Sequence, residues 1–146
     1  MTRHDFADVV SVLTENECLV LLESADLGRI AFAFEGTVEI FPINYCMTGT
    51  IIVFRTSPGA KLSAVAKTAV AVEIDSWDPA SGIGWSVVAK GFAEEITTNP
   101  GRASEHLRWL PVHPAAPGDR FHWVGIKPSE ITGRRFHVPR AKGERT

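Results

Sequence analysis

Apolar residues recur with the short period of a β-strand through the middle of the chain. Three segments rich in Ile, Val and Phe follow one another, at residues 27–34, 38–45 and 49–56. Glu35-Gly36 and Thr48-Gly49 separate these segments, and such dipeptides are typical of tight hairpin turns. The pattern therefore predicts an antiparallel meander.

Three later segments show the same kind of signal. Residues 69–75 alternate apolar and other side chains and predict a strand with one buried face. Residues 84–96 predict the longest strand, and Gly91 within it indicates a bulge or a sharp bend, which is how a sheet curls into a barrel. Residues 121–136 predict a last strand, which Pro128 interrupts at an edge or a break.

Short helices are expected between these strands. Thr14 and Glu17 form a capping box before an apolar run, so a helix is expected within residues 13–24. Residues 59–67 and 99–110 predict two more. About six strands without regular strand-helix alternation favour an antiparallel barrel of the α+β class.

One domain accounts for most of the chain. Residues 14–137 contain all of the strands that the pattern predicts after the first helix. We interpret residues 1–13 as an N-terminal arm and residues 138–146 as a basic, frayed tail. A length of 146 residues is sufficient for one core of this size.

Composition restricts the class of ligand. A formal charge of −2 with 22% charged residues gives no electrostatic reason to expect nucleic acid, so small molecules and proteins are the expected partners. No run of about 18 apolar residues predicts a membrane span, and no signal peptide is evident, so we expect a cytoplasmic protein. Cys18 and Cys46 form no CxxC pair, and no metal site is predicted.

The stretch "FRTSPGAKL", residues 54–62, carries the strongest chemical signal. Arg55 ends an expected strand, and Lys61 lies in the first turn of an expected helix, where a cation is unfavourable unless an anion is present. The Thr56 hydroxyl and the backbone N–H groups of the turn would converge on the same volume. The alternatives are a phosphate site, which lacks the Walker A spacing, and two solvated cations near a turn.

Other polar and aromatic residues have ordinary explanations. Tyr45 closes a strand and is expected to be packed, although it could donate a proton, and Trp85 is expected to be a packed strand aromatic. Glu94 and Glu95 alternate across a strand, so they do not form a catalytic pair. Since no acid-base pair or nucleophile is indicated, catalytic residues stay unassigned, and any redox chemistry would come from a cofactor.

Five segments together resemble a known family. These are "LGRIAF", "FPINY", "IIVFRTSPGAKL", "GWSVVAKGFAEEI" and "HWVGIKPSEITGRRF". They are similar to the pyridoxamine 5′-phosphate oxidase-like superfamily of flavin-binding split barrels, near its short nitroimidazole-reductase-like members, over about residues 14–137. The resemblance implies a mainly β, six-stranded antiparallel split β-barrel with short flanking helices, and a homodimer with FMN or a deazaflavin at the subunit interface.

The resemblance also assigns cofactor-binding residues. It implies phosphate contacts from Arg55, Thr56 and Lys61, and contacts with the isoalloxazine ring from Pro42, Ile43 and Asn44. On the other side of the ring it places Trp85 and Ser86, and it assigns contact with the partner's cofactor to Trp123 and Arg134.

Three functions are compatible with these assignments. The first is a flavin-dependent oxidoreductase, in which reduced FMN or deazaflavin delivers hydride to a small conjugated or nitro-bearing acceptor. The second is a flavin or haem carrier or sensor without turnover. The third is an interaction domain without a cofactor.

Overall fold

The computed structural model describes residues 8–56, 61–96 and 122–138. Its elements, in chain order, are β1 (Asp8–Val12), α1 (Glu15–Ser24), β2 (Leu27–Phe34), β3 (Thr37–Thr48), β4 (Ile51–Thr56), the 3-10 helix η2 (Lys61–Val65), β5 (Ala69–Trp77), β6 (Ile83–Ile96) and β7 (His122–His137). The helix expected at residues 99–110 lies outside the described residues, as does the basic tail after Val138.

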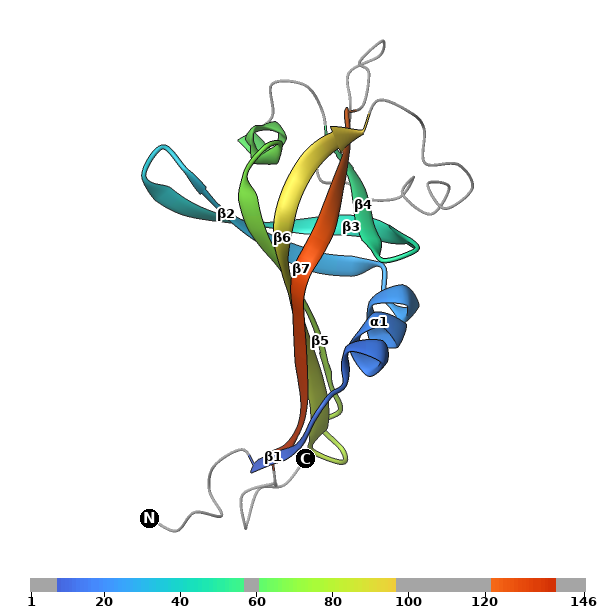
Figure 1. The fold of residues 1–146 in the computed structure, drawn as a ribbon. Helices are drawn as coiled ribbons and strands as arrows, with labels where there is room; N and C mark the ends of the chain where they lie inside the picture. Colours follow the sequence, from blue (N-terminus) through green and yellow to red (C-terminus); the bar gives the residue numbers. More distant parts are fainter. Residues whose placement is uncertain (1–7, 57–60, 97–121, 139–146) are drawn as a thin grey trace.

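Six strands close into a ring. Their order is β7-β4-β3-β2-β5-β6, and pairing of β6 with β7 completes the circuit, with every neighbouring pair antiparallel (Figure 1). The predicted six-stranded antiparallel barrel is therefore confirmed. A seventh strand, β1, pairs with the C-terminal half of β7 and comes from the segment that we interpreted only as an arm.

The interior of the ring is apolar, as the strand period requires. Val70, Val72 and Ile74 on β5 are all buried, as the alternation predicted. Tyr45 is 1% exposed, and its hydroxyl donates a hydrogen bond of 2.6 Å to the carbonyl of Leu22 on α1. The expectation of a packed tyrosine is confirmed, and this bond ties the helix to the barrel wall.

Helix α1 begins where its sequence signal predicted. The backbone N–H of Glu17 donates to Oγ1 of Thr14, and the backbone N–H of Thr14 donates to Oε1 of Glu17. Both halves of the capping box are present, which satisfies two donors at the helix start. Cys18 and Leu22 are buried and attach the helix to the core.

Strands β6 and β7 extend beyond the barrel and form an arm with β1 and the end of β5 (Figure 1). The expectation that residues 84–96 contain the longest strand was wrong, because β7 has 16 residues and β6 has 14. The ladder shifts register where Lys90 pairs with Glu130 and Gly91 with Pro128. The predicted irregularities at Gly91 and Pro128 are thus one bulge, and the extra residue is Ser129.

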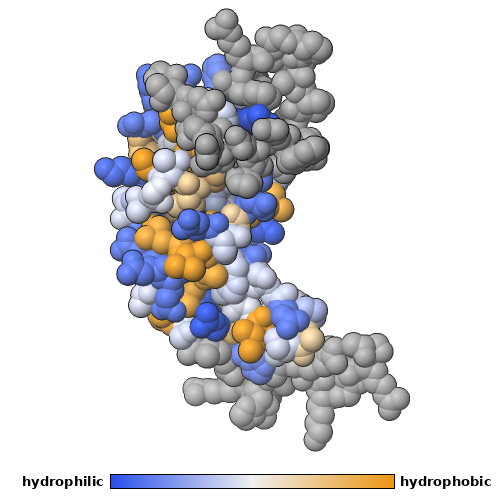
Figure 2. Space-filling model, turned by 90° about the vertical axis from the view of Figure 1, so that its right-hand side faces the viewer, coloured by the Kyte–Doolittle hydropathy of each residue, from blue (hydrophilic) through white to orange (hydrophobic). Residues whose placement is uncertain are grey.

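The molecule is curved, with the barrel at one end and the arm at the other. Figure 2 looks onto the side that carries α1 and shows apolar residues gathered at mid-height. Helix α1 lies on this side of the molecule (Figure 1), and its Val20 is 66% exposed. Among the described residues, no helix is long and apolar enough to cross a membrane.

Candidate functional site

Three of the predicted cofactor residues lie side by side on the outer face of the barrel. Arg55 on β4 pairs with Trp123 on β7, and Tyr45 on β3 pairs with Phe54, so continuing this register by one residue places Asn44 beside Arg55. Tyr45 and Phe54 belong to the core, so their neighbours along each strand point outward. We call Asn44, Arg55 and Trp123 the outer row.

Trp123 belongs to an apolar cluster on this outer face, separate from the barrel core. The cluster, here called the outer cluster, contains Cys46, Val53, Ile51, Ile96 and Trp123. Cys46 and Val53 are buried, and the other three are partly buried. The outer row therefore borders an environment from which water is largely excluded.

Arg55 is half-buried in this setting. Burial lowers the pKa of its guanidinium from the usual value, although an arginine stays charged in proteins. A partly desolvated cation gains more from an anion than an exposed cation does, because the local dielectric constant is lower. This position is electrostatically suited to a phosphate group.

Asn44 presents a buried acceptor that has no partner. Its Nδ2 donates a hydrogen bond of 2.6 Å to the carbonyl oxygen of Asp26, which fixes the amide orientation. Its Oδ1 is buried, and no described residue donates to it. Because an unsatisfied buried acceptor costs about 1–3 kcal/mol, the site calls for an external donor such as a ring N–H or a water molecule.

Lys61 has a carboxylate partner within the chain. Its Nζ lies 3.0 Å from Oε1 of Glu39 on β3 and 5.8 Å from the centre of the Phe34 ring. Glu39 lies an even number of positions from the core-facing Tyr45 along β3, so its side chain points to the same face as Tyr45. Arg55 faces outward. The unfavourable cation noted in the sequence is thus stabilised by Glu39 in this structure.

Two other predicted residues turn their side chains toward the barrel interior. Thr56 is 5% exposed and Ile43 is 2% exposed. Pro42 is exposed and pairs with Arg29 of β2. Any contact from Thr56 or Ile43 to a ligand on the outer row would therefore come from the backbone.

The remaining predicted residues lie on the arm. Ser86 pairs with Arg134, and Trp85 pairs with Arg135 and packs against the barrel core. Arg134 lies eleven positions after Trp123 on β7, which corresponds to about 36 Å of extended strand. One chain therefore presents the predicted residues as two separate groups.

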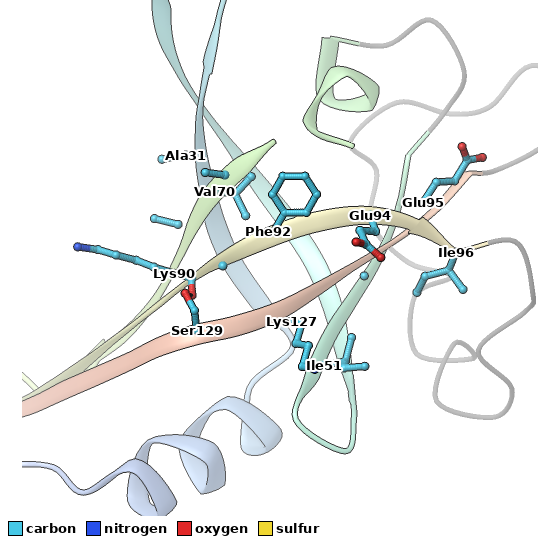
Figure 3. Close-up of a pocket in the computed structure, with 14 residues that line it drawn as sticks. Ala31, Ile51, Val70, Lys90, Phe92, Glu94, Glu95, Ile96, Lys127 and Ser129 are labelled. Carbon is cyan, nitrogen blue, oxygen red and sulfur yellow. The ribbon is translucent and has the colours of Figure 1, made fainter. Parts of the chain in front are cut away.

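An open groove follows the outer face of β6 and β7 next to the outer cluster. Its volume is about 910 Å³. It is lined by Ala31, Ile51, Ala69, Val70, Ala71, Lys90, Gly91, Phe92, Glu94, Glu95, Ile96, Gly125, Lys127 and Ser129. Figure 3 shows it running along β6 from Lys90 to Ile96. Ile96 pairs with Trp123, so the groove continues directly from the outer row.

Comparison with known sequences places the chain in a family. The family profile described as pyridoxamine 5′-phosphate oxidase matches residues 14–135, which is most of the chain. The chain belongs to the pyridoxamine 5′-phosphate oxidase family. The split-barrel fold expected from the resemblance is confirmed by related structures with the same architecture.

The relatives of this family member include flavin-binding proteins. An FAD-binding protein from Mycobacterium smegmatis is 36% identical, with 87% of this chain and all of that chain covered and a TM-score of 0.71. An FAD-binding protein from Mesorhizobium loti shares the fold at 24% identity, with 86% and 96% covered and a TM-score of 0.69. The uncharacterized protein Rv0080 of Mycobacterium tuberculosis is 33% identical over 130 residues, 85% of this chain and 84% of its own.

One polar cluster of this pyridoxamine 5′-phosphate oxidase family member was not predicted from the sequence. Nη1 of Arg29 lies 2.8 Å from Oε1 of Glu73 and 3.1 Å from Oδ2 of Asp75. Burial, followed by the hydrogen bond and charge of Asp75, raises the pKa of Glu73 to about 7, and Arg29 opposes this shift. The available signal was the spacing of Glu73 and Asp75, two residues apart in a strand and so on one face.

Proposed function

We propose that the chain binds a flavin nucleotide on its outer row and acts as an oxidoreductase. The observation that carries the proposal is the buried, unpartnered Oδ1 of Asn44 next to the half-buried Arg55. An acceptor and a cation on one face match a ligand with both an N–H donor and a phosphate. The FAD-binding relative at 36% identity supports the same ligand class.

Each residue has a distinct part in this proposal. Arg55 holds the cofactor phosphate, and Asn44 Oδ1 accepts a hydrogen bond from an N–H of the isoalloxazine ring. Trp123 and the outer cluster exclude water from the bound ligand. Lys61 joins the phosphate ligands only by exchanging the carboxylate of Glu39 for phosphate.

The bound flavin would supply hydride to a small conjugated or nitro-bearing acceptor. The chain's own contribution is binding, orientation and exclusion of water, because hydride delivery requires no acidic or basic side chain. Tyr45 is not available as a proton donor, since its hydroxyl donates to the Leu22 carbonyl and burial raises its pKa.

The separation of the two groups of residues supports a homodimer as part of the proposal. Ser86 and Arg134 lie on the arm and the outer row lies on the barrel, so in this proposal a second copy supplies the arm group that completes a site. In this arrangement each arm reaches the outer row of the other copy, which gives two equivalent sites.

The test is a fluorescence titration of the purified protein with FMN, FAD, a deazaflavin cofactor and riboflavin at one ionic strength. Submicromolar binding of a phosphate-bearing flavin, with weaker binding of riboflavin, is expected. Sedimentation in the same buffer should give a dimer. If the protein binds none of the four ligands, the proposal is wrong.

A flavin-binding or haem-binding protein without turnover is the second candidate. The observation in its favour is that the outer row contains no acid-base pair. Stopped-flow reduction with NADH, NADPH or dithionite, followed by addition of quinones and nitroaromatic acceptors, separates the two. Repeated turnover would exclude the second candidate, whereas a flavin that is bound but never reoxidised by an acceptor would support it.

A further inference from the structure

We propose that the groove along β6 binds the adenosine half of FAD, which makes FAD rather than FMN the preferred cofactor. The inference rests on the proposed function, because it places the phosphate end of the flavin at Arg55. It assigns a role to Phe92 and Glu94, which lie outside the predicted flavin site.

The outer row, which contains Arg55, and the groove along β6 lie next to each other on the sheet. Arg55 pairs with Trp123, and Trp123 pairs with Ile96, so these three side chains cross β4, β7 and β6 in one row of about 10 Å. The next row contains Val53, Gly125 and Glu94. Gly125 has no side chain, and the side chains of Ile96 and Ile51 lie over it, so these two residues form the apolar end of the groove next to Trp123.

FMN bound at Asn44 and Arg55 would leave the groove unoccupied. If the ring lies beside Asn44 and the phosphate beside Arg55, FMN ends at β4, and the groove begins on the opposite side of that phosphate. A volume of about 910 Å³ is at the upper end of small-molecule sites. Only a flavin that continues beyond its first phosphate would reach it.

The side chains that line the groove can contact both the base and the ribose of an adenosine. Phe92 lies four residues along β6 from Ile96, about 13 Å of strand, and the residue is 48% exposed where it lines the groove (Figure 3). An exposed aromatic ring offers a stacking surface for a purine. Glu94 lies between Phe92 and Ile96 and is exposed, so its carboxylate can accept hydrogen bonds from ribose hydroxyls.

The charges of the groove lining are balanced. The titratable side chains of the lining are Lys90, Lys127, Glu94 and Glu95, two cations and two anions. A balanced groove suits a neutral adenosine better than a polyanion. The polyglutamate tail of a deazaflavin would require an excess of cations, so the lining favours FAD over a deazaflavin as well.

The test compares dissociation constants of FAD and FMN by isothermal titration calorimetry, for the wild type and for Phe92→Ala, Glu94→Gln and Val38→Ala. Val38 is an exposed apolar residue on β3 that does not line the groove, so it is the matched control. We expect FAD to bind at least tenfold more tightly than FMN. Phe92→Ala should weaken FAD binding by about tenfold, and Glu94→Gln by a smaller factor, with FMN unchanged.

The outcomes separate this inference from the proposed function. Equal affinities for FAD and FMN would overturn the inference and leave flavin binding intact. An FAD preference that survives both groove substitutions would also overturn it, since the adenosine would then lie elsewhere. Absence of binding to either flavin would overturn both. AMP that competes with FAD but not with FMN would support the groove, and melting temperatures of the variants would show that they are folded.

Discussion

Two arginines on the outer face of the barrel have opposite surroundings. Arg29 is exposed and contacts two carboxylates at 2.8 and 3.1 Å. Arg55 is half-buried next to apolar residues and beside an Asn44 oxygen that no described residue satisfies. Carboxylates of the chain complement the first arginine, whereas the second lies beside a buried acceptor, Oδ1 of Asn44, that no described residue satisfies. The unsatisfied Asn44 oxygen in a partly apolar setting, rather than the presence of a cation, identifies a candidate ligand site.

The largest expected effect tests this comparison directly. Arg55→Gln should weaken binding of FMN or FAD by roughly ten- to a hundredfold, because loss of a charge-assisted hydrogen bond costs about 1.5–3 kcal/mol. Riboflavin has no phosphate, so its affinity should not change. Arg29→Gln is the matched control and should leave all flavin affinities unchanged. Equal losses in the two variants would contradict the assignment of Arg55.

Asn44→Ala should have the next largest effect. We expect binding of every flavin, riboflavin included, to weaken by about tenfold, because the ring N–H loses its acceptor. The free energy of unfolding of the apo-protein should fall by less than about 1 kcal/mol, since removal of an unsatisfied oxygen offsets the lost bond to Asp26. Denaturant titration and ligand titration measure the two quantities. A large loss of stability with unchanged affinity would indicate a purely structural residue.

A smaller effect is expected at the Lys61–Glu39 ion pair. Glu39→Gln releases the ammonium, so FMN and FAD should bind about two- to fivefold more tightly, the range that corresponds to an exposed ion pair. Riboflavin again serves as the control ligand. If affinities for the phosphate-bearing flavins do not change, Lys61 is not a phosphate ligand and is explained by Glu39 alone.

The smallest effect concerns pH. The pKa of Glu73 rises from 4.5 to about 7 on folding, so between these values the folded state binds more protons than the unfolded state. The free energy of unfolding should therefore fall as pH rises through this window and level off above it. Glu73→Gln should remove this part of the slope. With a third of the side chain exposed, the change should stay below about 1 kcal/mol. Urea titrations from pH 4.5 to 8 would show whether the slope persists in the variant.

Much of the fold could be predicted because its signals are local. The capping box at Thr14 and Glu17 and the alternation through β5 depend only on neighbouring residues, and both are confirmed. Strand β1 was missed because "DVVSV" is short and gains its partners only from the far end of β7. Irregularities at Gly91 and Pro128 were predicted separately, but their union in one bulge with Ser129 as the extra residue was not, since a shift of register exists only between two strands.

The candidate site was less predictable than the fold. The local sequence signal at Arg55 and Lys61 suggested one shared site, but Lys61 contacts Glu39, a residue 22 positions earlier in the chain. Trp85, Ser86 and Arg134 were grouped with the outer row by resemblance, and the length of β7 separates them within one chain. The spacing of residues along the sequence does not show whether side chains from two distant strands lie on the same face of a closed barrel.

Ser129 is one extra residue within the longest strand, β7. Before it, even-numbered residues of β7 such as Val124 and Ile126 enter the core, and after it odd-numbered residues such as Ile131 do so. Removal of Ser129 would leave Arg134 on its present face, because Glu130 would still follow Pro128 opposite Lys90. What would be lost is the local increase in twist that a bulge provides. One inserted residue thus sets the direction in which the arm leaves the barrel and leaves the order of side chains along it intact.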